Sequence, residues 1–383
     1  MKRKGHIISV KGTAMKRLFK TIISILLLLV FLVGCTGKET SSSTDPEASF
    51  SSTVIPSSCP ETVSSDPAQS DPWKETPDPG SHYTFQWKVC SSFLRDVFGD
   101  AMCDSWFSLV DAIMTGSDTF ECPDDDTCKW MMGQFPCRCL PPLIEQIYTG
   151  GDPDHPVKDG RVTICYMTSR EETIARICDF ADRVERILNE TLKDDYSDFE
   201  KALAMYQYFT SHYEYDYESY EKMKDHPVEY LSAYRLIMEG KGICSDIAPA
   251  YAFMLMQAGV DCGTMSGQSN YSGEGHEWAY IRLGEHYYHI DPTYGLSEPE
   301  SLRFFLMTDD QRDSGEYPRS SFEIISHYSK DHPHEEYIAD DTFFSPLWYG
   351  FDFVMDHSKE MIIYKAYDYY GDPLDLSFTY CGY

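Results

Sequence analysis

The chain has 383 residues, of which 42% are hydrophobic, so it can bury one large core or two to three smaller ones. Its 62 acidic residues outnumber its 32 basic ones and give a formal net charge of −30. A surface this acidic repels nucleic acid and anionic lipid, and we therefore exclude proteins that bind either of them through a basic patch.

The N-terminus is typical of a targeting segment. A basic stretch at residues 15–20 precedes an apolar run at 21–33, which is shorter than the roughly 20 residues that a membrane-spanning helix needs. The run ends in Leu-Val-Gly-Cys35, which resembles the lipobox of bacterial lipoproteins. The resemblance implies a signal peptide over residues 1–34, a lipid on Cys35 and an outward-facing anchor in the cell membrane. An ordinary signal peptide with an incidental cysteine is the alternative.

Two regions separate this segment from the predicted core. Residues 35–80 are rich in Ser, Thr and Pro and have little to bury, which predicts a disordered tether that holds the domain clear of the membrane. Residues 81–194 are predicted to be mainly helical. Apolar spacing favours short helices at 87–97 and 106–114, followed by a strand at 161–166. The role of this region does not follow from its sequence.

The sequence predicts no metal site. Cysteines 122, 128, 137 and 139 miss the usual zinc spacings, so we interpret them as disulfides or buried thiols. The acidic run at 124–126 is interpreted as a solvated turn, with a calcium site as the alternative. Of the 13 cysteines, 11 remain once Cys35 and Cys244 are set aside, an odd number that leaves at least one more unpaired.

Two helices have clear start signals. Ser169 and Glu172 form one capping box, and Ser197 and Glu200 form a second one at the start of the predicted core, residues 195–315. Each box is followed by an apolar stripe at helical spacing. Past the second helix lie four tyrosines, which we interpret as loop packing, with the wall of a substrate groove as the alternative: Tyr213, Tyr215, Tyr217 and Tyr220.

A glycine-rich turn then leads to a single cysteine. A third helix is predicted to begin with Pro227 in its first turn and to stop at Gly240. The chain re-enters a helix at Cys244, where Pro249 is expected to keep the first turns irregular. A thiolate is the nucleophilic form of cysteine, and the positive N-terminal end of a helix favours it. Cys244 is therefore a candidate nucleophile whose backbone N–H can donate to an oxyanion.

A predicted hairpin supplies possible partners for this thiol. After a strand at 260–266, strands at 276–283 and 286–291 are joined by Gly-Glu, which favours a two-residue type II′ turn. In that register His276 and Asp291 are diagonal neighbours on one face, with Cα atoms roughly 7–8 Å apart. His289 lies on the same face, so spacing alone leaves two histidines open.

Three segments together carry a family resemblance. Gly-Lys-Gly-Ile-Cys244-Ser-Asp, Gly-His276-Glu-Trp and His-Ile-Asp291-Pro-Thr resemble the transglutaminase-like superfamily. The resemblance implies Cys244 as nucleophile, His276 rather than His289 as base, and Asp291 as the residue that orients the base. It also implies an α+β, papain-like core, in which the helix carrying the cysteine packs on an antiparallel sheet carrying the histidine and aspartate. A helical N-terminal extension and a small β-rich region at 316–383 would flank this core.

The resemblance leaves the oxyanion partner open. Transglutaminases use an upstream tryptophan for this purpose, and this chain has none between Trp130 and Trp278. Tyr234 and Gln207 are substitute candidates by their nearness in sequence. Trp278 is a candidate substrate contact, with a core position as the alternative.

The activity that follows is acyl transfer, or hydrolysis, at peptide or glutamine amide bonds through a Cys244 thioester. This chemistry needs no cofactor, and the expected partners are protein or peptide substrates, including cell-wall peptides, with membrane contact through the N-terminal lipid only. The alternatives are a non-catalytic surface binding module on the same fold and a cysteine peptidase that cuts cell-wall peptides.

Overall fold

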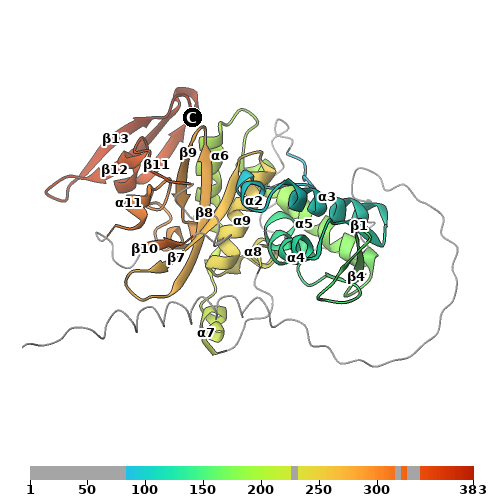
Figure 1. Cartoon of the computed structure of the whole chain (residues 1–383). Helices are drawn as coiled ribbons and strands as arrows, with labels where there is room; N and C mark the ends of the chain where they lie inside the picture. The colour runs from blue at the N-terminus through green and yellow to red at the C-terminus, as the bar shows by residue number, and fades with distance from the viewer. Residues whose placement is uncertain (1–82, 226–231, 315–320, 326–336) are drawn as a thin grey trace, which may run out of the picture. The chain divides into compact units, whose positions relative to one another are not determined.

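The computed structural model describes residues 83–225, 232–314, 321–325 and 337–383 (Figure 1). The predicted signal peptide, the lipidated Cys35, the whole tether and the helix start at Pro227 lie outside these residues. Within the described ranges, no helix is both long and apolar enough to cross a bilayer.

The N-terminal region combines helices with a small antiparallel sheet. Its elements are α2 (Ser92–Phe98), α3 (Asp100–Thr115), β1 (Thr119–Glu121), α4 (Asp125–Cys139), η1 (Pro141–Leu143), β2 (Ile147–Thr149), β3 (Val157–Lys158), β4 (Arg161–Tyr166) and α5 (Arg170–Thr191). The strand predicted at 161–166 is β4, and β1, β2 and β3 all pair with it. This region is therefore mainly helical, as predicted.

The two short helices predicted in this region are present with shifted bounds, and the interpretation of the acidic run is wrong. The first helix begins only at Ser92, and Gly99 with φ +81° separates it from α3, because a backbone turn of this kind suits glycine. The acidic run at 124–126 is a helix start and not a solvated turn. The Asp124 carboxylate accepts a hydrogen bond of 2.8 Å from the backbone N–H of Thr127, and the next two acids favour the positive end of α4.

Both predicted capping boxes form. Ser169 starts α5 and Ser197 starts α6 (Asp198–His212), and in each case the serine and the glutamate three residues later exchange hydrogen bonds with the backbone. These bonds satisfy N–H groups that a helix start leaves without intrahelical partners. The apolar stripes behind them are buried.

The central sheet contains the predicted hairpin. It has four antiparallel strands in the order β10–β7–β8–β9, namely β7 (Cys262–Ser269), β8 (Gly275–Leu283), β9 (His286–Ile290) and β10 (Phe322–Ile325). Leu283 pairs with His286 and Ala279 with Ile290, which confirms the predicted register and the two-residue turn. Strand β10 adds to this sheet from beyond residue 315, where the core was predicted to end.

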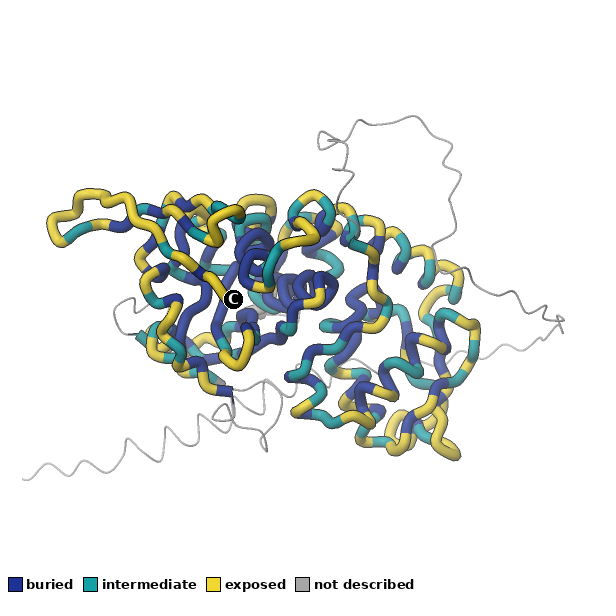
Figure 2. The backbone as a smooth tube through the Cα atoms, turned by 90° about the horizontal axis from the view of Figure 1, so that it is seen from above, coloured by how far each residue is buried: buried dark blue, intermediate teal, exposed yellow. Residues whose placement is uncertain are grey.

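The helix that carries Cys244 packs on this sheet. Helix α9 (Cys244–Gln257) contacts β7 and β8, and its residues from Asp246 onward are buried (Figures 1 and 2). The helix is continuous through Pro249, so the predicted irregular start is wrong. The shorter elements of the core are β5 (Glu214–Tyr215), α7 (Tyr217–Asp225), α8 (Ala233–Glu239), β6 (Lys241–Gly242), α10 (Pro292–Gly295) and α11 (Asp309–Arg312). This is the predicted α+β arrangement.

The C-terminal residues form a sheet of their own. Its strands are β11 (Phe351–Asp356), β12 (Met361–Tyr367) and β13 (Pro373–Thr379), preceded by η4 (Ser345–Tyr349) and linked by η5 (His357–Lys359). The hairpin of β12 and β13 stands out from the rest of the backbone, and most of β13 is exposed (Figure 2). The sheet is tied to the core through Glu200 of α6, which accepts hydrogen bonds from Tyr380 at 2.6 Å and His357 at 2.7 Å.

The cysteines of the N-terminal region lie mostly inside it. Cys122, Cys128 and Cys139 are buried free thiols, as one of the two predicted states requires. The sulfur atoms of Cys90 and Cys103 lie 3.0 Å apart.

Candidate active site

The glycine-rich turn places Cys244 at the first position of α9. Gly240 ends α8 with φ +86°, and the next two residues pair in parallel with β5 before α9 begins. A Cβ on Gly242 would come within 2.7 Å of the Cβ of Asp246, so this position requires glycine. Cys244 is partly exposed. As the first residue of a helix, it keeps a backbone N–H that intrahelical bonding does not use.

A buried carboxyl group supports this turn. Asp246 accepts a hydrogen bond of 2.8 Å from the backbone N–H of Ile243, and its side chain is fully buried. Burial raises the pKa of Asp246 to about 7, although the bond from Ile243 and the charge of Arg235 oppose the rise. Asp246 therefore fixes the start of α9 while carrying less negative charge near neutral pH than an ordinary carboxylate.

His276 and Asp291 meet as the hairpin register predicts. The Nε2 of His276 donates to Oδ2 of Asp291 at 2.7 Å. Pairing of β8 with β9 stops at Ile290, so Asp291 stands at the strand end, where its other oxygen caps α10 by accepting from the N–H of Tyr294 at 3.1 Å. Both side chains are largely shielded, with exposed fractions of 8% for His276 and 0% for Asp291.

The imidazole of His276 is held in its charged form. Burial alone lowers its pKa, but the charge and hydrogen bond of Asp291 and a hydrogen bond to Cys244 raise it to about 9. Because Nε2 is committed to Asp291, Nδ1 is the nitrogen left for the thiol. The ring packs against Phe322 at 4.8 Å and Tyr294 at 5.2 Å between centroids, which limits its movement. Cys244, His276 and Asp291 thus form one connected group.

A buried arginine completes this group, and the sequence did not reveal it. The Nη2 of Arg312 donates to Oδ2 of Asp291 at 2.8 Å, and its guanidinium lies 4.2 Å from the ring centroid of Trp278. Burial by itself raises the pKa of Asp291, but the charges of His276 and Arg312 hold it below the ordinary value. In the sequence Arg312 follows two aspartates at the end of an acidic stretch, where it resembles an ordinary surface charge.

The second histidine of the hairpin is not available to the thiol. His289 is fully buried, its Nδ1 accepts the indole N–H of Trp278 at 2.8 Å, and its Nε2 donates to Asp309 at 2.8 Å. An indole N–H can only donate, so Nδ1 of His289 carries no proton. Geometry therefore selects His276 independently of any family resemblance.

The contacts described for the three candidates for oxyanion or substrate contact do not place any of them against the Cys244 sulfur. Tyr234 stacks on Phe180 at 5.6 Å and lies under the guanidinium of Arg176, so it faces α5. Gln207 lies in the middle of α6, and no contact described for it reaches Cys244. Trp278 is fully buried and donates its N–H into the core, so it is a core residue and cannot contact a substrate.

Tyrosines surround the thiol instead. Burial raises the pKa of Tyr220 and of Tyr294 to about 12 and raises that of Tyr215 further, and the nearby Cys244 contributes to each rise. Tyr220 also forms a hydrogen bond with Glu274 at the turn before β8. Two of the four tyrosines that we interpreted as loop packing therefore border the site. Tyr215 reaches it because β5 pairs with β6, directly before Cys244.

The N-terminal region also contacts the strand that carries His276. Arg138 of α4 forms an ion pair with Glu277, the residue after His276, at 3.4 Å, and both side chains are nearly buried. This contact anchors the strand that carries His276.

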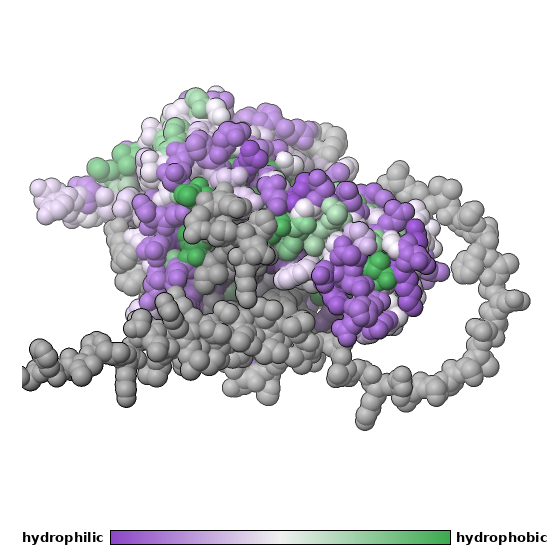
Figure 3. All heavy atoms as spheres, viewed as in Figure 1, coloured by the Kyte–Doolittle hydropathy of each residue, from purple (hydrophilic) through white to green (hydrophobic). Residues whose placement is uncertain are grey.

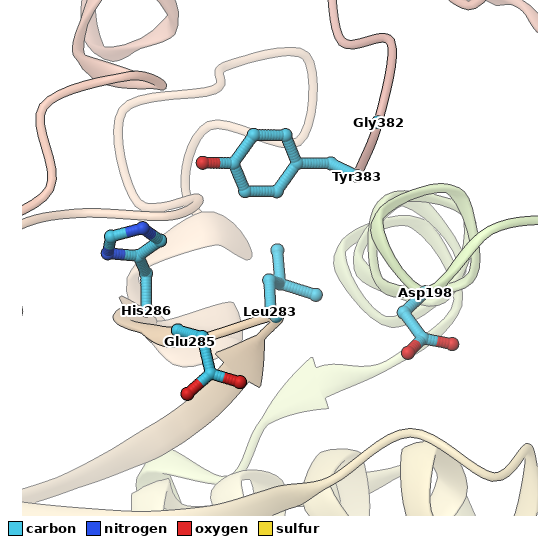
Figure 4. Close-up of a pocket in the computed structure, with 7 residues that line it drawn as sticks. Asp198, Leu283, Glu285, His286, Gly382 and Tyr383 are labelled. Atoms are coloured by element: carbon cyan, nitrogen blue, oxygen red, sulfur yellow. The ribbon is translucent and has the colours of Figure 1, made fainter.

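A cavity of about 460 Å³ at the far end of the hairpin is separate from this group (Figure 4). Leu283, Glu285 and His286 line it, together with Asp198 and Tyr383. His276 and Leu283 are seven residues apart on β8, a separation of about 23 Å along an extended strand. The cavity therefore takes no part in the chemistry of Cys244.

Comparison with known proteins agrees with this geometry. Residues 185–292 match the family model of the transglutaminase-like superfamily, and that range contains Cys244, His276 and Asp291. This chain carries a transglutaminase-like domain. No curated protein matches the chain.

Solved structures related to the transglutaminase-like domain are distant. A crystal structure of a TGase is 16% identical, with a TM-score of 0.28, and the match covers 38% of this chain and 43% of that one. A cysteine-protease candidate from Cytophaga hutchinsonii is 19% identical, with a TM-score of 0.24, and the match covers 30% of this chain and 38% of that one. The chain thus spans less than half the length of either protein.

Proposed function

We propose that the transglutaminase-like domain is an enzyme that transfers or hydrolyses acyl groups at peptide or glutamine amide bonds through a thioester on Cys244. The observation that carries the proposal is the connected group of Cys244, His276 and Asp291. A base between a thiol and a carboxylate is the arrangement that activates a nucleophile.

The electrostatics support an ion pair of thiolate and imidazolium. The pKa of His276 is about 9, so its ring is protonated at neutral pH. Arg312 and His276 keep Asp291 ionised, which stabilises that positive charge. The N-terminal end of α9 favours negative charge on the sulfur. All three influences favour the ion pair of thiolate and imidazolium.

In the first half of the reaction, the Cys244 thiolate attacks the amide carbonyl carbon and forms a C–S bond. The carbonyl oxygen becomes an oxyanion, which the free N–H of Cys244 can stabilise. His276 gives its proton to the leaving nitrogen, the C–N bond breaks, and a thioester remains. In the second half, His276 removes a proton from an amine or water, which attacks the thioester and releases the thiolate.

The test is alkylation of Cys244 by iodoacetamide between pH 5 and pH 9, followed by peptide mapping to separate this thiol from the others. We expect alkylation at pH 6 to be fast in the native protein and much slower in His276→Ala, because the variant lacks the imidazolium that stabilises the thiolate. His286→Ala is the matched control, because this histidine is half-exposed on the same hairpin. An alkylation profile that His276→Ala leaves unchanged would contradict the proposal.

The nature of the acceptor separates the alternatives. Incorporation of a fluorescent primary amine into a glutamine peptide indicates a transferase, whereas new free amines without incorporation indicate a peptidase. If Cys244→Ser retains full biological activity, the domain acts as a binding module.

We also propose that the enzyme is anchored on the outer side of the cell membrane through a lipid on Cys35. The lipobox-like sequence and the Ser/Thr/Pro-rich stretch that follows support this location. Metabolic labelling with an alkyne fatty acid tests it, because Cys35→Ala should lose the label and leave the membrane fraction. A label that persists in Cys35→Ala would exclude this anchor.

A further inference from the structure

A second cavity, of about 610 Å³, lies where the loop after α10 meets the C-terminal sheet. Its walls come from residues 298–303 on one side and from η4 and the start of β11 on the other, with Tyr367 at the end of β12. The two walls are joined by hydrogen bonds from Leu302 N–H to Gly350 O at 2.8 Å and from Asp352 N–H to Glu300 O at 2.9 Å. The cavity is therefore built from the fixed backbone of two regions, and its volume suits a small ligand.

Aromatic rings form one side of this cavity. Tyr367 and Phe351 stack with centroids 4.6 Å apart, and Tyr367 is 66% exposed. Tyr349 also lines the cavity and is 55% exposed. Tyr369 and Tyr370, between β12 and β13, are also exposed. Hydrophobic groups are visible on the protruding arm of the molecule (Figure 3). Exposed rings that gather around a cavity indicate a surface for stacking a ligand.

Polar groups form the other side and restrict the charge of the ligand. Glu298 and Glu300 are carboxylates, and Arg303 pairs with Glu298 at 3.0 Å. The acidic excess, within a chain of net charge −30, repels anions. Arg303 offsets one of the two carboxylates, so the lining carries a formal charge of only −1 and presents both hydrogen-bond donors and acceptors. A neutral ligand with many hydroxyl groups can bond to both kinds of group.

We propose that this cavity binds a neutral oligosaccharide, a function separate from the chemistry of Cys244. One pyranose ring stacks its C–H face on Tyr367, and neighbouring hydroxyls bond to Glu300, Ser301 and Arg303. Flat rings with equatorial hydroxyls fit this stack, because such rings expose apolar faces on both sides.

Isothermal titration of the full chain with cellotetraose and with tetra-N-acetylchitotetraose tests the proposal. The two sugars share a β-linked pyranose backbone and differ in their acetamido groups, so their relative affinities distinguish plain glucans from amino-sugar chains. We expect Tyr367→Ala to weaken binding by about tenfold, as loss of an aromatic stack does, and Tyr349→Ala to act in the same direction. Tyr148→Ala is the matched control, because Tyr148 lies on β2 and is 48% exposed.

Because Tyr367 is mostly exposed, we expect Tyr367→Ala to fold like the native chain, and an unchanged melting temperature verifies this. Three outcomes would overturn the proposal. The first is no binding of either sugar at about 5 mM, the weak end of measurable affinity. The second is equal binding by Tyr367→Ala and the native chain. The third is binding of choline without binding of sugar.

Discussion

The β8–β9 hairpin carries the histidines of two histidine–aspartate pairs. The two pairs differ in what the second imidazole nitrogen contacts. His276 bonds to Asp291 at 2.7 Å, and His289 bonds to Asp309 at 2.8 Å. The remaining nitrogen of His289 accepts the N–H of Trp278, so that ring is fixed in one neutral tautomer. The ring of His276 forms a hydrogen bond with Cys244 instead. A histidine–aspartate pair thus becomes a candidate base only where its free nitrogen meets a reactive group.

The carboxylates of the two pairs also differ. Asp291 is fully buried and receives a second hydrogen bond from the guanidinium of Arg312 at 2.8 Å. Asp309 has an exposed fraction of 25% and receives its second bond from the backbone N–H of Ala339 at 3.2 Å. The His276–Asp291 pair therefore depends on buried charges, whereas the His289–Asp309 pair needs only a hydrogen-bond donor and an acceptor.

Removing the His276 imidazole should mainly lower activity, and removing the His289 imidazole should mainly lower stability. We expect His276→Ala to lower the rate of amide turnover by about 10²- to 10⁴-fold, because a positioned base or acid contributes that much. His289→Ala should lower the free energy of unfolding by about 3 kcal/mol, since it leaves a cavity and an unpaired indole N–H. Ammonia release from a glutamine peptide measures the first effect, and urea unfolding measures the second.

Per folded molecule, His289→Ala should turn over at nearly the native rate. A loss of turnover in His289→Ala as large as that in His276→Ala, measured under conditions where both are folded, would show that the two pairs act together. In that case the distinction drawn from the second nitrogen would be wrong.

The His276–Asp291 pair could be predicted from the sequence, whereas the partners on α11 could not. The turn at Gly284 fixed the register, and the register placed His276 beside Asp291, because pairing in a hairpin propagates from its loop. Arg312 and Asp309 lie on α11, and no periodic pattern connects that short helix to the hairpin. Contacts between elements that are distant in sequence leave no local signal.

The same limit applies to the oxyanion candidates. Tyr234 lies ten residues before Cys244, but it belongs to a separate helix, α8, where its ring packs on Phe180 of α5. Tyr215 is farther away in sequence and nearer in space, because a short parallel pairing of β5 with β6 brings it back. Helix starts were predictable because capping boxes are local, and the acidic start of α4 was missed because acids also favour turns.

The buried arginine should matter mainly to the first pair. We expect Arg312→Met to lower the free energy of unfolding by about 3–5 kcal/mol, because it leaves the Asp291 carboxylate without its buried counter-charge. Urea unfolding measures this loss. Arg282→Met is the matched control, since Arg282 pairs with Glu285 on the exposed part of the same hairpin and should change stability by less than about 1 kcal/mol. Equal stability of the two variants would contradict the role assigned to Arg312.

The first pair should also give the protein a pH dependence above neutrality. The pKa of His276 is raised from 6.5 to about 9 on folding, so the protonated ring stabilises the folded state. This contribution, about 3 kcal/mol from the size of the rise, is complete below pH 6.5 and is lost as the pH increases through 9. Urea unfolding between pH 6 and pH 10 should therefore show a steeper decline for the native chain than for His276→Gln. Parallel declines would show that His276 is not protonated in the folded protein at neutral pH.

The smallest effect is expected from neutralising the second carboxylate. In Asp309→Asn the amide oxygen can still accept from His289 and from the N–H of Ala339, because the tautomer of His289 needs an acceptor and not a charge. We expect a loss of less than about 1 kcal/mol in unfolding free energy, the range of a single neutral hydrogen bond. Asp291→Asn is the paired variant, and there the same change leaves Arg312 buried without a counter-charge and removes the stabilisation of the His276 imidazolium. A cost for Asp309→Asn that approaches the cost for Asp291→Asn would mean that His289 is charged, and both pairs would then be built alike.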